Sequence, residues 1–168
     1  MIRPTGDADF DTILEIVNTA AAVYKGVIPA DRWHDPYMPP AELATEIAAG
    51  VGFWGFDEAG AMRGVMGLQT VADVVLIRHA YVRPEDQGRG IGGALLKALQ
   101  ARTDRPLLIG TWAAATWARK FYEKHGFREV DRETKDRLLG TYWSIPARQT
   151  ETSVVLADRR WWDATGIG

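Results

Sequence analysis

The sequence predicts an α/β protein, and three observations carry that prediction. Strand-like runs rich in β-branched and aromatic residues recur between stretches whose apolar residues repeat at helical spacing. The chain has 168 residues, 46% of them hydrophobic and 25% charged, which is enough for one compact domain with a sizeable core. No internal repeat, low-complexity segment or linker interrupts it, so we expect a single domain over residues 1–168.

The N-terminal part predicts a strand, a helix, a long loop and a second helix. Residues 2–4 form a short strand, and Asp7 or Asp9 can cap the helix that follows. Its apolar residues lie three or four apart: Phe10, Ile13, Leu14, Val17 and Ala21. The stretch 24–40 has four prolines and a glycine, and a loop of this length is often functional. The alternative is a linker pinned by its aromatic residues. Residues 41–50 predict the second helix.

The rest of the chain alternates between strands and helices. "VGFWGF" and "RGVMGLQTV" predict an antiparallel hairpin, and "VVLIRHAYV", residues 74–82, is the strongest strand pattern. The helix that starts near residue 91 carries Ile91, Leu95 and Leu99 on one stripe. The later elements are a strand in "PLLIGTW", a helix in "TWARKFYEKHG", a strand in "FREV", a short helix in "KDRLLGTYW" and a last strand in "TSVVLA".

The segment "QGRGIGG", residues 87–93, connects the strongest strand to a helix and predicts an anion site. Glycines allow successive backbone N–H groups to point into one concavity, and the helix N-terminus adds a positive dipole. Arg89 adds a full charge. Such a loop suits a phosphate or pyrophosphate. A glycine-rich turn without a ligand is the alternative.

Gly88, Gly90 and Gly93 also spell G-x-G-x-x-G, the dinucleotide-binding pattern. A Rossmann site has its first glycine almost at the end of the strand and an acidic residue about 20 positions further on. Here five residues, 83–87, separate the strand from the glycine, and the next strand carries no acid. The match therefore does not indicate a nicotinamide cofactor.

"VRPEDQGRGIGGALL" resembles the acyl-CoA-binding segment of the GNAT N-acyltransferases. The signature Q/R-x-x-G-x-G/A of that family is matched by Gln87, Gly90 and Gly92, and Val82 and Pro84 match the residues before it. "ARKFYEKHGF" resembles a second segment of the family, and the order of elements is also similar over nearly the whole chain.

The resemblance implies a fold and a cofactor. It implies a mixed central sheet of about seven strands with about four helices, splayed between the fourth and fifth strands, with acetyl-CoA as co-substrate. The pantetheine arm would pair with the backbone of residues 80–82, and the pyrophosphate would bind the amides of residues 87–92. The cofactor-binding residues so implied are Ala80, Tyr81, Val82, Gln87, Gly88, Arg89, Gly90, Ile91, Gly92 and Gly93.

The implied reaction is attack of an amine on a thioester. An alkyl amine has a pKa of about 10.4, so it must lose a proton before it attacks. A backbone N–H near Tyr81 or Val82 would stabilise the oxyanion. The resemblance places the acid that protonates the departing thiolate at Tyr122. A core aromatic with a bonded hydroxyl is the alternative for that tyrosine.

The base is less clearly indicated. Many family members carry a carboxylate on the fourth strand, and Leu76 occupies the matching position. His79 lies on the same strand and has a suitable ordinary pKa of about 6.5, but a β-bulge would decide where it points. A structural role for His79 and a water chain without a base are the alternatives. Weaker candidates are His34, Asp35, Asp73 and Glu85.

For the acceptor, the sequence offers aromatic residues and acids in two segments. Trp33 and Tyr37 lie in one, and Tyr142 and Trp143 in the other. Aromatic rings with nearby acids suit a cationic amine, although Arg148 could meet a carboxylate. Ala115 stands where the family often has an Asn that contacts the cofactor. The next residue, Thr116, is the candidate to make that contact instead.

Composition excludes several other functions. The net charge of −2 does not indicate nucleic-acid binding, and no apolar run has the ~20 residues of a membrane span. There is no cysteine, and the three histidines lack metal-ligand spacing, so we expect no metal. The N-terminus does not resemble a signal peptide, and we expect a cytoplasmic protein. Trp161 and Trp162 either mark a homodimer surface or close the core.

The leading hypothesis is an N-acetyltransferase that uses acetyl-CoA and a primary amine of a small molecule or amino acid. The amine of a protein or peptide is a second candidate acceptor. A non-catalytic acyl-CoA sensor is a third hypothesis, since Leu76 and Ala115 depart from the family pattern, although Tyr122 argues against it.

Overall fold

The structure is a computed structural model that describes residues 1–167, and these contain seven strands and seven α-helices. The strands are β1 (Ile2–Pro4), β2 (Gly52–Glu58), β3 (Ala61–Val71), β4 (Val74–Val82), β5 (Leu107–Trp112), β6 (Arg128–Glu129) and β7 (Ser153–Ala157). The helices are α1 (Phe10–Ala21), α2 (Pro40–Ala48), α3 (Ile91–Gln100), α4 (Thr116–Lys124), α5 (Arg132–Tyr142), α6 (Ala147–Glu151) and α7 (Arg159–Thr165). The strand order is β1-β2-β3-β4-β5-β7-β6, so the predicted sheet of about seven strands is confirmed.

Three details differ from the sequence prediction. Residues 1–167 contain seven α-helices against about four predicted, and α6 and α7 lie outside the five stretches predicted to be helical. α6 has five residues and buries none, so it has no apolar periodicity to detect. α7 follows β7 after a single residue, Asp158. The N-cap that Asp158 provides is the strongest sequence signal for this helix. The carboxylate of Asp9 does not cap α1, because it accepts hydrogen bonds from Gly6 N and from Arg3, each at 2.9 Å.

The chain divides into two compact units. The first unit contains Met1–Gln69 and Ile77–Asp104, and the second contains Thr70–Leu76 and the residues from Arg105 onward. β4 is divided between them: its first three residues belong with β5, and its last six belong with the unit that contains most of β3. β4 and β5 are joined through α3, the crossover that parallel neighbours require, so the sheet is mixed.

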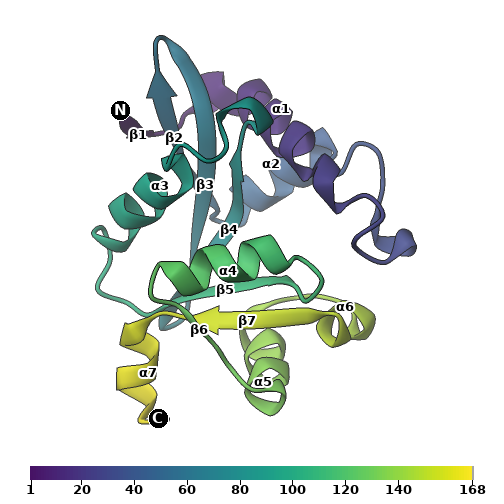
Figure 1. The fold of residues 1–168 in the computed structure, drawn as a ribbon, viewed down its shortest axis with the longest axis vertical. Helices are drawn as coiled ribbons and strands as arrows, with labels where there is room; N and C mark the ends of the chain where they lie inside the picture. The colour runs from purple at the N-terminus through teal and green to yellow at the C-terminus, as the bar shows by residue number, and fades with distance from the viewer. Residues whose placement is uncertain (168) are drawn as a thin grey trace. The chain divides into compact units, whose positions relative to one another are not determined.

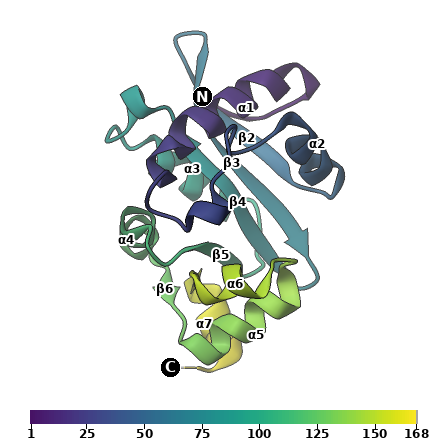
Figure 2. The same cartoon turned by 90° about the vertical axis from the view of Figure 1, so that its right-hand side faces the viewer.

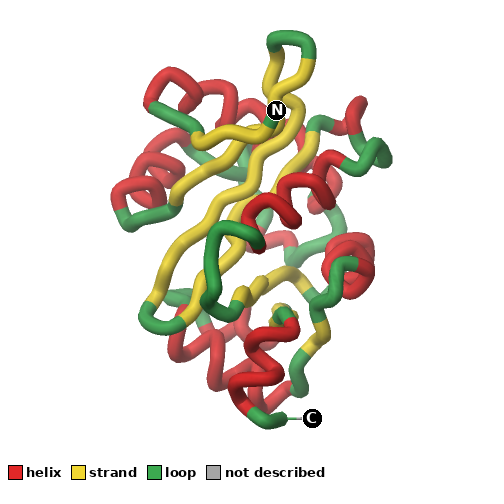
Figure 3. Tube along the Cα trace, turned by 90° about the vertical axis from the view of Figure 1, so that its left-hand side faces the viewer, coloured by secondary structure: helices red, strands yellow, loops and turns green. Residues whose placement is uncertain are grey.

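In the first unit, β1, β2 and β3 pair antiparallel, and β2 and β3 form a long twisted hairpin (Figure 3). Residues of α1, α2 and these strands form one buried core: Ile13, Ile16, Val17, Met38, Leu43, Val51, Phe53, Met62 and Val65. Met38 comes from the long loop before α2. The side-chain amide of Asn18 holds it there, because it donates to Met38 O at 3.0 Å and accepts from Met38 N at 2.7 Å. This loop is therefore anchored at its far end.

In the second unit, β7 lies between β5 and β6 and pairs antiparallel with both (Figure 1). α5 and α6 lie side by side (Figure 2). The buried ammonium of Lys135 links them by donating to Thr150 O at 2.7 Å. Trp161 is 5% exposed within the core of this unit, and Trp162 donates from its indole N–H to Ala157 O. These tryptophans close the core, and a homodimer stays a prediction.

Within residues 1–167, no helix combines the length and the apolar composition that crossing a bilayer requires. The expected cytoplasmic location stays a prediction.

Candidate functional site

The loop between β4 and α3 turns twice into left-handed backbone conformation. A single 3-10 turn, Pro84–Asp86, follows the strand. Gly88 and Gly90 then have φ values of +79° and +82°, which residues with a Cβ rarely adopt. Gly90 directly precedes α3, and its carbonyl accepts the first hydrogen bond of the helix, from Ala94 N at 3.0 Å. The two glycines are thus required by the backbone that starts this helix.

Six consecutive backbone amides in this loop donate no hydrogen bond within the described residues 1–167. They are the amides of Gly88, Arg89, Gly90, Ile91, Gly92 and Gly93. The first amides of a helix have no intrahelical acceptor, and the helix dipole adds positive potential at the same end. Gln87 does not belong to the set, because its amide donates to Pro84 O and its side chain donates to Val82 O. The loop has the donors that a pyrophosphate requires.

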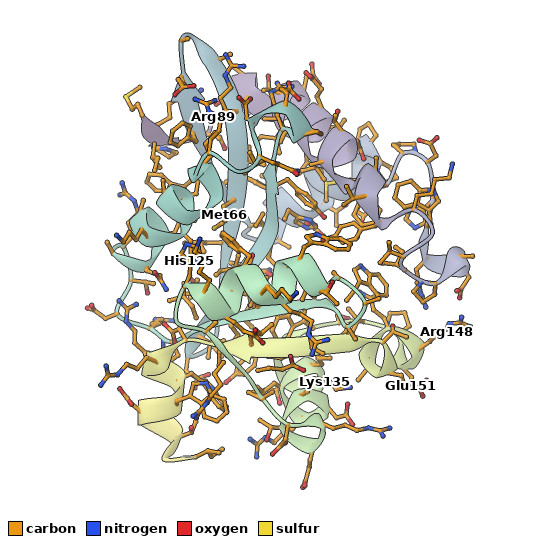
Figure 4. All side chains as sticks on the ribbon, in the orientation of Figure 1. Met66, Arg89, His125, Lys135, Arg148 and Glu151 are labelled. Carbon is orange, nitrogen blue, oxygen red and sulfur yellow. The ribbon has the colours of Figure 1, made fainter. Side chains whose placement is uncertain are left out.

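Arg89 does not contribute an unshared positive charge to this loop. Its guanidinium donates to Asp86 Oδ1 and to Glu58 Oε2, each at 2.6 Å. The Arg89 side chain is labelled in Figure 4. The hydrogen bond to Glu58, followed by that to Asp86, raises the pKa of Arg89. Asp86 is 7% exposed and also lies 3.6 Å from the guanidinium of Arg63. The open amides, more than the Arg89 charge, make the loop attractive to an anion.

His79 occupies an irregularity of β4. Its φ is +53°, a left-handed backbone conformation that residues with a Cβ rarely adopt. Its imidazole Nε2 contacts Glu46 Oε2 on α2, and its ring stacks on Phe53 with centroids 6.2 Å apart. Gly67 of β3 makes room here, because a Cβ at that position would lie 2.8 Å from Arg78 O.

Glu46 was not among the residues predicted from the sequence. Its carboxylate also accepts from Arg78 at 3.2 Å. Burial raises the pKa of Glu46, but the hydrogen bond and charge of His79 and the charge of Arg78 outweigh burial, so the pKa is lowered overall. No signal in the sequence distinguishes this glutamate from any exposed glutamate of an amphipathic helix.

The two aromatic residues predicted for the acceptor in the first unit do come together. Trp33 and Tyr37 are stacked with centroids 5.7 Å apart, and Tyr37 packs on Tyr24 at the same distance. Tyr24 in turn meets Tyr81 of β4 edge to face at 6.4 Å. Burial, followed by the neighbouring Tyr24 and Tyr37 hydroxyls, raises the pKa of Tyr81. Tyr24 begins the predicted loop but was not singled out.

Tyr122 belongs to the second unit, on α4. It is 4% exposed, and its ring packs edge to face against Phe121 and Phe127, with centroids at 5.0 and 5.5 Å. Its ring therefore has a structural role whatever its hydroxyl does. Gly126, predicted to end this helix, has a φ of +88°.

Tyr142 and Trp143, predicted for the acceptor, also belong to the second unit. The Tyr142 hydroxyl donates to Asp73 Oδ1 at 2.6 Å, and burial together with this carboxylate raises the pKa of Tyr142 to about 12. Trp143 covers Gly110, where a Cβ would lie 3.3 Å from the indole ring. Asp73 is therefore engaged by a phenol, which weakens its candidacy as a base. Leu76 is fully buried and provides no acid–base group.

Comparison with known proteins identifies the family. Residues 18–139 match the family model described as an acetyltransferase (GNAT) domain. The peptidyl-lysine N-acetyltransferase YiaC of Escherichia coli is 27% identical over 154 residues, which cover 89% of this chain and 99% of that protein.

Two solved structures are similar over 94% of this chain. The PaiA N-acetyltransferase of Thermoplasma acidophilum in complex with coenzyme A has a TM-score of 0.69, 18% identity and 97% coverage of its own chain. The ribosomal-protein-S18-alanine N-acetyltransferase of Escherichia coli has a TM-score of 0.67, 20% identity and 92% coverage. The family match spans most of the chain and includes the glycine loop and α4, so this protein belongs to the GNAT acetyltransferases and is an acyl-CoA-dependent N-acetyltransferase.

Proposed function

We propose that this protein transfers an acetyl group from acetyl-CoA to a primary amine of a small molecule or amino acid. The observation that carries the proposal is the row of six unpaired amides at residues 88–93, which matches the demand of a pyrophosphate. The coenzyme A bound to the related PaiA enzyme supports the choice of cofactor.

The remaining cofactor contacts and the proton donor follow from family resemblance. The backbone of residues 80–82 would pair with the pantetheine arm, and an N–H of Tyr81 or Val82 would stabilise the oxyanion. Tyr122 would protonate the departing thiolate. Replacing Tyr122 by Phe keeps the packing ring but removes the proton, so kcat should fall by about 100-fold while acetyl-CoA binding is retained. An unchanged kcat in Tyr122→Phe would exclude this role.

A cationic acceptor is supported by the aromatic set of the first unit, Tyr24, Trp33, Tyr37 and Tyr81. Electron-rich rings attract ammonium groups. The relative YiaC, by its name, acts on peptidyl lysine, which supports a second candidate acceptor of the same chemistry. Trp33→Leu should raise KM for the amine without changing KM for acetyl-CoA.

A thiol-release assay with acetyl-CoA over a panel of amines tests the proposal. The panel contains polyamines, free amino acids, a lysine peptide and a peptide with a free N-terminus. Turnover of a small amine supports the proposal, and turnover of the lysine peptide alone replaces it with the second candidate. Tight binding of acetyl-CoA without turnover of any amine would favour a non-catalytic sensor. Thermal stabilisation of the protein by NAD but not by acetyl-CoA would contradict the proposed acetyltransferase function.

A further inference from the structure

Glu46 and His79 form a carboxylate–imidazole pair inside the first unit. The carboxylate comes from the last turn of α2, and the imidazole comes from β4, at a residue with left-handed backbone conformation. Their side chains are 17% and 15% exposed, and the interacting atoms, Glu46 Oε2 and His79 Nε2, are fully enclosed. The pair is thus shielded from water, where an ionic contact is stronger than at the surface.

The surroundings hold this pair in one geometry. Arg78 donates to Glu46 Oε1 at 3.2 Å and to Gln69 Oε1 at 2.9 Å. Phe53 lies along one face of the imidazole. The left-handed φ of His79 is costly for a residue with a Cβ, and such strain often marks functional positions. Among residues 1–167, Glu46 of α2 contacts the imidazole, and Arg78 of the same strand contacts Glu46.

The two imidazole nitrogens have different environments. A carboxylate can only accept, so in the neutral ring the proton lies on Nε2, which faces Glu46. Nδ1 has no hydrogen-bond partner among residues 1–167, and it is not one of the enclosed polar atoms there. Nδ1 therefore carries a lone pair that no described residue engages.

We infer that His79 is the general base of the acetyl transfer and that Glu46 is its positioning residue. The inference rests on the proposed function. His79 Nδ1 takes one proton from the acceptor ammonium, and Glu46 stabilises the resulting imidazolium. The neutral amine then attacks the thioester carbonyl. The C–N bond forms, the C–S bond breaks, and coenzyme A leaves as a thiolate that takes the hydroxyl proton of Tyr122. The proton that the nitrogen loses on becoming an amide then restores that hydroxyl. Glu46 thus supplies the carboxylate that Leu76 cannot, from α2 instead of β4.

The tautomer of His79 gives a test that needs no acceptor. Nitrogen-15 NMR of the histidine rings in the full chain, assigned with His79→Gln, should show a neutral His79 with its proton on Nε2 and a bare Nδ1. In Glu46→Gln this preference for one tautomer should weaken. A proton on Nδ1 in the wild-type protein, or a ring that stays charged throughout the pH range of activity, would overturn the inference.

Kinetics test the catalytic part. His79→Gln should lower kcat by about 100-fold or more, as expected for loss of a general base. Glu46→Gln should lower kcat by roughly tenfold with an unchanged KM for acetyl-CoA. Glu42→Gln is the matched control, since Glu42 lies one turn earlier on the same helix and is exposed.

A merely structural ion pair would give a different result. Glu46→Gln would then unfold at a lower temperature but keep the wild-type kcat in its folded fraction, and this outcome would overturn the inference. Failure of the proposed function is distinguishable, because the wild-type protein would then acetylate no amine of the panel. If no amine is acetylated, the His79 tautomer measured by NMR would still show whether Nδ1 is the nitrogen that can accept a proton.

Discussion

α3 of the first unit begins differently from α5 and α7 of the second. Asp131 precedes α5 and accepts from Thr134 N at 2.8 Å, and Asp158 precedes α7 and accepts from Trp161 N at 3.2 Å. Gly90 precedes α3 and has no side chain to offer, so the amides there stay open. The nearby carboxylate of Asp86 is bonded to Arg89 instead. A capped helix start serves the fold, whereas an uncapped glycine start is available to a ligand.

The two capped starts also differ from each other. The hydrogen bond from Thr134 N to Asp131 lowers the pKa of that exposed carboxyl. Burial raises the pKa of Asp158, and the amides of Leu107 and Trp161 oppose burial only in part. Asp158 is 5% exposed and accepts from Leu107 N at 3.1 Å, so it joins α7 to β5. Removal of this buried cap should therefore cost more than removal of the exposed one.

The largest effect is expected when a carboxylate is introduced at the uncapped N-terminus of α3. Gly90→Asp places a carboxylate beside the free amides of α3, where it competes with the pyrophosphate and repels it. Loss of two charge-assisted hydrogen bonds should raise the Kd of acetyl-CoA by about 100-fold or more, measured by calorimetry. Gly90→Ala is the control, because it introduces the same left-handed strain without the charge. Equal affinity in the two variants would contradict a ligand-binding role for the open amides.

A smaller but clear effect is expected for substitution of Asp158, the buried N-cap of α7. Asp158→Ala leaves the buried amide of Leu107 without its acceptor and removes one of the two acceptors of the Trp161 amide, so it should lower the free energy of unfolding by about 3 kcal/mol. Urea denaturation measures this loss. Asp158→Asn keeps an acceptor oxygen and should lose less. If Asp158→Ala were as stable as the wild type, the cap would have no structural importance.

The smallest effect on stability is expected for substitution of Asp131, the exposed N-cap of α5, and it should depend on pH. Asp131→Ala should lower Tm at pH 7 by less than Asp158→Ala does. Because the folded pKa of Asp131 is lowered, its stabilisation is present above the unfolded value of about 3.9 and is lost as pH falls through the folded value. The Tm difference from the wild type should therefore disappear in acid. A difference that persists at pH 2 would exclude the charged carboxylate as its cause.

The order of strands and most helices could be predicted because each has a local signal. Alternation and β-branched runs mark the strands, and Gly90 with the three glycines around it marks the start of α3. α6 is too short for such a signal, and Glu46 resembles any solvent-facing glutamate. The partners of Arg89 could not be predicted either, since Glu58 is 31 residues away in sequence.

The sequence by itself determined the fold class, the family and the glycine loop, because these depend on periodicity and on residues that must lack a Cβ. Only the tertiary structure decided which way His79 points and what it meets. The left-handed backbone of His79 and a carboxylate from α2 together set that direction. Such a contact between residues 33 positions apart has no period or spacing in the sequence, so packing alone creates it.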